Sequence, residues 1–193
     1  YYGTLDGCML TNNSAVSGGA AYFASLNGCA LRSNSVSAYA PYGGAAYFCT
    51  LNNCTVAGNS AAGTWPYGGG AYSGTANNSI LYFNTASNGP NFHLPGQSTL
   101  SYCCTTPDPG GAGNISSAPL FMDYAAGNLR LQSNSPCING GNNADVFAPM
   151  DLDSNSRLIG GTVDIGAYEF PVAASPFSLW LQQYGLPTDG SAD

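Results

Sequence analysis

GGAAYF at residues 18–23 recurs unchanged at 43–48 and again as GGGAYS at 68–73. The copies begin 25 residues apart, and self-similarity with a period of roughly 20 to 50 residues indicates a solenoid. Each copy opens with a glycine pair and is too short to show a 3.6-residue periodicity, which predicts a β-strand after a turn. The repeat therefore predicts a stack of coils that bury their inward side chains against one another.

A second repeated segment follows each glycine-rich strand and ends in asparagine. Because these asparagines are equivalent, we expect them to stack as an amide ladder in which each side chain bonds those above and below. The first spacing is 21 residues and the later ones are 25, which indicates a shorter first turn. The predicted structural ladder consists of Asn13, Asn34, Asn59 and Asn84.

Leucines and cysteines recur in the same frame and predict three stacked sheets. The inward column is predicted at Leu5, Leu26 and Leu51, and a buried thiol ladder at Cys8, Cys29 and Cys54. Stacked parallel side chains point alike and do not readily reach the Cβ separation of roughly 3.5 to 4.5 Å that a disulfide needs. Cys137 is instead expected to be bridged, with either Cys103 or Cys104 as its partner, since consecutive residues point apart.

The repeats resemble those of bacterial β-helix surface proteins. The glycine-rich start, combined with an apolar-x-x-Asn segment such as Leu31 to Asn34, resembles the repeats of polymorphic outer membrane proteins. The second half is more similar to the choice-of-anchor Q group of right-handed β-helix proteins, through Ser101–Pro107, Ser135–Asn139 and above all Val163–Glu169. The resemblance implies a β-helix and a secreted or surface location. It implies little about chemistry, because members of the group are mostly of unassigned activity.

Repeat and resemblance together predict an all-β fold, a right-handed parallel β-helix with an irregular C-terminal cap and a short terminal helix. The predicted domain is 1–171, with regular coils at 1–90 and irregular coils and a cap at 91–171. Residues 172–193 are expected to form a linker with a short helix (FSLWLQQY) that leads to a missing downstream segment.

The charge of the chain excludes some partners. Lys and Arg together number 3 against 10 Asp plus Glu, for a formal net charge of -7. This excess of negative charge disfavours binding to nucleic-acid phosphates and to anionic lipid surfaces. No nucleic-acid partner is therefore expected. No stretch reaches the roughly 18 apolar residues of a membrane span. The expected partners are a polysaccharide or a cell-surface protein, and the expected location is extracellular or on the cell surface.

An enzyme has to be judged by its site, because parallel β-helices also carry polysaccharide lyases and hydrolases. A uronate lyase needs cations to neutralise the substrate carboxylate, and this chain has three scattered arginines and no lysine. A hydrolase needs two carboxylates across one groove, whereas Asp108, Asp123 and Asp145 are spread through the irregular part. No catalytic residue is predicted, and a fragment of a lyase or hydrolase remains the alternative function. His93 is expected in a loop or at an edge.

Aromatic residues make up 12% of the chain and supply the predicted binding site. The turns that vary in length hold four of them, and flat rings beside small polar residues suit either sugar rings or protein contacts. The predicted glycan- or protein-binding residues are Tyr39, Tyr42, Trp65 and Tyr67. We predict a non-catalytic adhesive or structural module. The column containing Tyr47 and its neighbour containing Phe48 are predicted to point to opposite faces, one in the core and one exposed.

One loop contains the alternating oxygen ligands of a calcium site, at Asp151, Asp153 and Asn155. It lacks the later glycine and glutamate of an EF-hand. The alternative is a structural turn in which Arg157 pairs with Asp164 or Glu169. No cofactor is expected apart from calcium at this loop.

Overall fold

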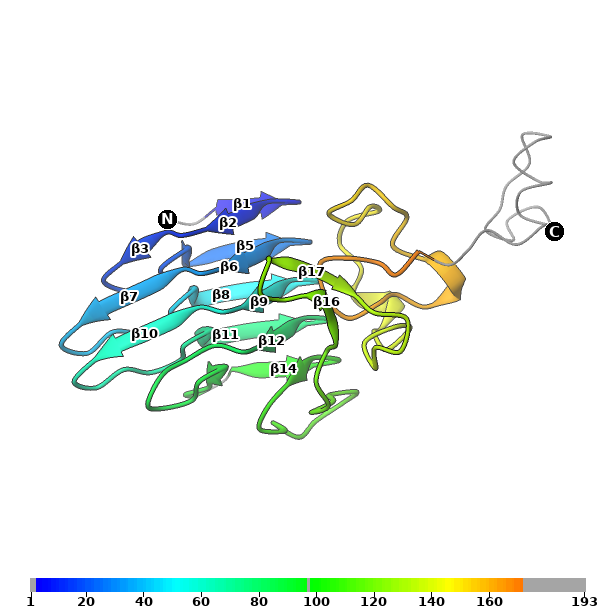
Figure 1. Ribbon diagram of the computed structural model, residues 1–193. Helices are drawn as coiled ribbons and strands as arrows, with labels where there is room; N and C mark the ends of the chain where they lie inside the picture. The colour runs from blue at the N-terminus through cyan, green and yellow to red at the C-terminus, as the bar shows by residue number, and fades with distance from the viewer. Residues whose placement is uncertain (1–2, 97, 172–193) are drawn as a thin grey trace, which may run out of the picture.

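Three parallel β-sheets, stacked coil upon coil, form the first part of the chain in the computed structural model, which describes residues 3–96 and 98–171 (Figure 1). They make a parallel β-solenoid of about four turns with about 25 residues in each coil. The all-β prediction is therefore confirmed, as is the prediction of three stacked sheets. The predicted terminal helix and linker at 172–193 lie outside the described residues.

The chain passes through the three sheets in the same order in successive coils, and some coils contribute two short strands to the first sheet. The first sheet contains β1 (Gly3–Asp6), β4 (Ala21–Tyr22), β5 (Ala24–Asn27), β8 (Ala46–Asn52), β11 (Ala71–Asn77), β13 (Phe92–His93) and β14 (Thr99–Ser101). The second sheet contains β2 (Met9–Thr11), β6 (Ala30–Arg32), β9 (Thr55–Ala57), β12 (Ile80–Tyr82) and β15 (Cys104–Thr105). The third contains β3 (Ser14–Ala15), β7 (Ser35–Ala38) and β10 (Ser60–Gly63).

The register of the first sheet matches the predicted inward column. Leu5 pairs with Leu26, and Leu26 pairs with Leu51. The column continues through Ala76 to Leu100. Equivalent residues of successive coils are thus direct neighbours across the ladder, and their side chains form one continuous apolar core.

The glycine pairs are explained by how closely the coils approach at one corner. The first glycine of each pair has a positive φ, for example +66° at Gly43. The second glycine lies so close to the next coil that a Cβ on Gly44 would be 2.0 Å from the carbonyl oxygen of Gly69. A larger residue at either place would strain the backbone or separate the coils.

The asparagine ladder is confirmed. The Nδ2 of Asn34 donates to Oδ1 of Asn59 at 2.9 Å, and Nδ2 of Asn59 donates to Oδ1 of Asn84 at the same distance. Asn13 donates to Asn34 in the same way. The ladder continues to Asn91, which sequence reasoning missed because it lies only seven residues after Asn84. Asn91 ends the ladder by donating to the carbonyl of Thr106.

The stack ends after a parallel bridge between Cys104 and Ile115. Residues 119–171, here called the lateral segment, pack against the side of the solenoid (Figure 1). This segment contains an antiparallel pair, β16 (Phe121–Asp123) and β17 (Asn128–Leu131), and two 3-10 helices at Asn143–Asp145 and Ile159–Gly161. The sequence predicted irregular coils and a cap for residues 91–171 but no position for them. The lateral position arises because the outer face of the second sheet is apolar and has to be covered.

One apolar cluster joins the two parts. It combines outward residues of the second sheet with residues of the lateral segment, namely Ala30, Ala57, Ile80 and Cys104 with Phe121, Leu129, Leu131, Cys137, Ile165, Ala167 and Tyr168. In β12 the neighbouring side chains alternate, since Ile80 faces this cluster and Leu81 faces the solenoid core. The second sheet is therefore covered on both faces at β6, β9, β12 and β15, whereas β2 is largely exposed.

The cysteines form a ladder of free thiols, as predicted. Cys29 and Cys54 each donate to a backbone carbonyl of the preceding coil, at 3.3 Å. The column continues through Ser79 to Cys103, whose pKa burial raises to about 12. The predicted disulfide of Cys137 is wrong, because all of these thiols are free. Cys104 is the residue that shares the lateral cluster with Cys137, while Cys103 points into the solenoid.

The described part of the chain has no helix with the length and apolar character that crossing a membrane requires.

Candidate functional site

The outer side of the first sheet carries aromatic rings in three columns, here called the aromatic face. One column contains Phe23 and Phe48, a second contains Tyr22, Tyr47, Tyr72 and His93, and a third contains Tyr42 and Tyr67. His93 lies on the edge strand β13, in register with Tyr72. The repeat of the sequence is what places these rings one above another.

The prediction that the Tyr47 and Phe48 columns point to opposite faces is wrong. Phe23 and Phe48 have left-handed backbones, with φ of +51° and +50°. A left-handed residue interrupts the alternation of a strand, so two consecutive side chains point outward together. The rings of Tyr47 and Phe48 are in edge-to-face contact at 4.7 Å, and Phe48 is 40% exposed.

Within each column the rings cover each other's faces. The Phe23 and Phe48 centroids are 5.0 Å apart with an interplanar angle of 2°, and those of Tyr47 and Tyr72 are 5.5 Å apart at 8°. Burial and the neighbouring tyrosines raise the pKa of Tyr47 and Tyr72, so both hydroxyls stay neutral. Where two rings of a column stack, their edges and hydroxyls are what they offer to a ligand.

The four predicted binding residues divide into two pairs. Tyr42 and Tyr67 stack on each other at 5.9 Å and belong to the aromatic face. Tyr39 and Trp65 project from adjacent turns and are 74% and 54% exposed. The backbone N–H of Trp65 donates to the carbonyl of Tyr39 at 3.0 Å, so the two turns are in contact. Neither ring stacks on another aromatic ring of residues 3–96 and 98–171, so both keep free faces.

An open groove lies where the Phe23–Phe48 column ends. The next position of this column is Ser73, whose hydroxyl is 3.1 Å from that of Ser98. Ser98 also accepts from the backbone N–H of Gly74 at 3.2 Å. The groove is lined by Phe48, Tyr72, Ser73, Gly74, Thr75, Pro95, Gly96 and Ser98. Sequence reasoning missed it, although the change from Phe to Ser at the third repeat was visible.

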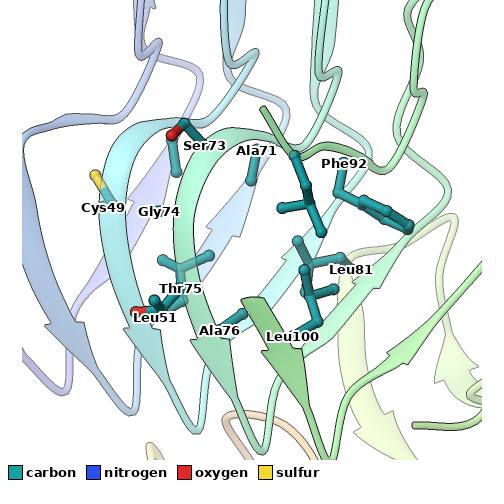
Figure 2. Close-up of a pocket in the computed structure, with 12 residues that line it drawn as sticks. Cys49, Leu51, Ala71, Ser73, Gly74, Thr75, Ala76, Leu81, Phe92 and Leu100 are labelled. Carbon is teal, nitrogen blue, oxygen red and sulfur yellow. The ribbon is translucent and has the colours of Figure 1, made fainter. Parts of the chain in front are cut away.

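Behind this groove the solenoid interior holds a small apolar cavity (Figure 2). Leu51, Ala76, Leu81 and Leu100 converge on it, and Phe92 closes it from the last coil. Its volume is about 10 Å³, close to the least that one water molecule requires. The cavity is a packing defect at the end of the core, too small for an organic ligand.

The predicted calcium loop uses its oxygens for other contacts. Asp151 Oδ1 accepts from the backbone N–H groups of Asp153 and Asn155, at 2.8 and 2.7 Å. Asp153 forms an ion pair with Arg130. No group of three or more His, Cys, Asp or Glu side chains in the described residues is placed to hold a metal ion. These contacts favour the structural turn, and calcium binding stays a prediction.

A buried charged cluster holds the lateral segment against the solenoid. Arg157 pairs with Glu169 at 3.4 Å with both side chains 1% exposed, as one of the sequence alternatives predicted. Asp164 accepts from the backbone N–H groups of Asn139 and Phe170. Because these groups are buried and bound to backbone, they are structural and do not reach a substrate.

Burial, followed by the negative charge of Asp164, raises the pKa of Glu169 from 4.5 to about 8. Burial also raises the pKa of Asp164. The folded state therefore binds protons that the unfolded state has released, and the stability that this supplies is lost as pH rises through the folded pKa.

We expect the free energy of unfolding to fall by about 1 kcal/mol per pH unit between about pH 5 and pH 8. Urea unfolding at several pH values measures this slope. Glu169→Gln removes the titrating group and should flatten the profile. A parent protein whose stability rises across this range would contradict the assignment.

The other predicted carboxylates do not form a catalytic pair at the groove. Asp108 accepts from the N–H of Gly110, Asp123 from the N–H of Ala126, and Asp145 from the amide of Asn142. The groove at Phe48 is lined by aromatic, hydroxyl and small residues. Comparison of the chain with protein-family models, with curated proteins and with solved structures gave no match.

Proposed function

We propose that this protein is a non-catalytic secreted or cell-surface module that binds polysaccharide through its aromatic face and the adjoining turns. The observation that carries the proposal is the set of outward aromatic columns on a rigid repeated scaffold. Apolar rings bordered by hydroxyl and amide groups match the mixed surface of a sugar chain. A rigid scaffold also keeps these groups in place before the ligand arrives, which reduces the entropy lost on binding.

The turns next to the third column complete this surface. Trp65 and Tyr39 offer free ring faces at the turns, and Tyr42 and Tyr67 offer ring edges and hydroxyls beside them. The resemblance of the repeats to polymorphic outer membrane proteins and to the choice-of-anchor Q group supports a location outside the cell. Display of many copies on one cell would strengthen weak individual contacts through multivalency.

Replacing both Tyr39 and Trp65 with Ala should weaken binding to a polysaccharide panel by about tenfold, since each stacked ring contributes on the order of 1 kcal/mol. Affinity electrophoresis in gels containing soluble polysaccharides measures the change. Phe147→Ala is the matched control, because Phe147 is a 60% exposed ring on the lateral segment. It should leave binding unchanged.

The same panel tests for turnover by measuring new reducing ends and unsaturated products. We expect none. If the parent does cleave a polysaccharide and an Asp substitution abolishes the cleavage, the protein is a glycan-active enzyme. That result would overturn the proposal. If the double variant binds as tightly as the parent, Tyr39 and Trp65 do not contribute to the binding site.

A further inference from the structure

The column of Phe23 and Phe48 lacks a ring at its third position. Ser73 stands there with φ of +57°, nearly the same backbone conformation as the +51° and +50° of the two phenylalanines. The chain thus keeps the geometry that displays a stacked ring but omits the ring itself. The face of Phe48 that points toward Ser73 has no aromatic partner within the column, and Phe48 is 40% exposed. The groove described above occupies this place.

The chemistry of the groove suits a sugar ring better than an apolar side chain. Phe48 supplies an apolar face, and the ring of Tyr72 lies at 64° to it with centroids 6.2 Å apart. Ser73, Thr75 and Ser98 also line the groove. The hydroxyl of Ser98 donates to the carbonyl of Pro95 at 2.9 Å, and that of Thr75 donates to the hydroxyl of Thr50 at 3.4 Å. A sugar ring has an apolar face of C–H groups and a rim of hydroxyls. Its face can stack on Phe48 while its rim exchanges hydrogen bonds with the serines and the threonine.

The distribution of charge in the chain favours an uncharged sugar as the ligand of this groove. The residues that line the groove carry no charged side chain among those the structure describes. The three arginines are committed elsewhere, because Arg32 donates to the carbonyl of Ala125, Arg130 pairs with Asp153 and Arg157 is buried. A uronate or sulfated sugar would therefore find no cation here, and the net charge of -7 would repel it.

We propose that the groove between Phe48 and Ser98 is a subsite for one uncharged sugar ring, stacked on Phe48 in the position that a third phenylalanine would fill. This inference rests on the proposed glycan-binding function and adds to it a location and a ligand class. The subsite lies beside the aromatic face, so one glycan chain can occupy both.

Ser73→Phe is the direct test, because the backbone at this position already accepts phenylalanine in the two preceding coils. The new ring should stack on Phe48, fill the groove and weaken binding by at least about tenfold. The probes are cellohexaose, xylohexaose, mannohexaose and chitohexaose, with hexagalacturonate as the acidic counterpart, measured by isothermal titration calorimetry. Circular dichroism of each variant checks that the fold is intact.

A second pair of variants leaves the groove open. Phe48→Leu removes the stacking face and should weaken binding about fivefold, whereas Phe147→Leu replaces an exposed ring on the lateral segment, outside the aromatic face, and should change affinity less than twofold. If the parent binds a neutral hexasaccharide and Ser73→Phe binds it equally well, the subsite is wrong and the proposed function stands. Preference for hexagalacturonate would overturn the ligand class. Failure of the parent to bind any glycan would overturn the subsite and the proposed function together.

Discussion

Replacing Arg157 with Met is expected to lower the free energy of unfolding by about 3 to 5 kcal/mol. Arg157 comes from the lateral segment and is 1% exposed. Its guanidinium donates to the carbonyls of Gly166 at 2.8 Å and Ala167 at 3.2 Å, and it reaches the carbonyl of Asn53 in the solenoid. Methionine fills much of the same volume but leaves these carbonyls, and the Glu169 oxygen that accepts from the guanidinium, without their donor.

Arg130→Met is the matched control, because this arginine also pairs with a carboxylate but is 46% exposed. Exposed ion pairs contribute about 0 to 1 kcal/mol, so a small effect is expected. Urea unfolding followed by circular dichroism measures both variants under the same conditions. Equal effects of the two substitutions would show that the buried pair does not hold the lateral segment in place. A double variant, Arg157→Met with Glu169→Leu, should regain part of the loss by removing the unpaired carboxyl.

The regular coils could be predicted from the sequence because each coil obeys the same local rules. Residues at equal positions of a parallel stack meet one another, so a period of 25 residues fixes which leucines, cysteines and asparagines become neighbours. Asn91 escaped this reasoning because the last coil is shortened, and the spacing to Asn84 breaks the period. Repetition therefore predicts pairings as long as the repeat motifs recur, as they do across the shorter first step of 21 residues, and fails where the motifs stop.

The lateral segment could not be predicted from local patterns. Its position depends on contacts far apart in the sequence, such as the Arg157 hydrogen bond to Asn53 and the packing of Cys137 near Cys104. A repeating sequence pattern cannot indicate contacts between residues so far apart in the chain. The apolar outward residues of the second sheet were the available signal, since Ala30 and Ile80 would be unusual on a solvent-facing strand.

The sequence predicted that aromatic residues form the candidate site, but it did not predict how their rings are arranged. The variable turns correctly indicated exposed rings at Tyr39 and Trp65. The simple alternation of a strand misplaced the Phe48 column, because a left-handed φ at a phenylalanine is rare and carries no sequence signal. That single backbone feature brings two columns onto one face and leaves the groove where the phenylalanines stop.

The asparagine ladder should be nearly as sensitive as the buried arginine, and Asn59→Leu is expected to lower the free energy of unfolding by about 3 to 4 kcal/mol. Asn59 is 1% exposed. Its Oδ1 accepts from the backbone N–H and the Nδ2 of Asn34, both at 2.9 Å, and its Nδ2 donates to the carbonyl of Leu31. Leucine has a similar volume but leaves these buried groups unpaired, and each such group costs about 1 to 3 kcal/mol, partly relieved by relaxation.

Asn13→Leu is the control at the exposed end of the same ladder. Asn13 is exposed, and its side chain donates one hydrogen bond, to Oδ1 of Asn34. Water can replace that donor, so a loss of about 1 kcal/mol or less is expected. If the two variants unfold at the same urea concentration, the ladder adds specificity to the stacking but little stability. If Asn59→Leu alone is strongly destabilised, the amides hold successive coils in register, and through them the spacing of the aromatic columns on the neighbouring sheet.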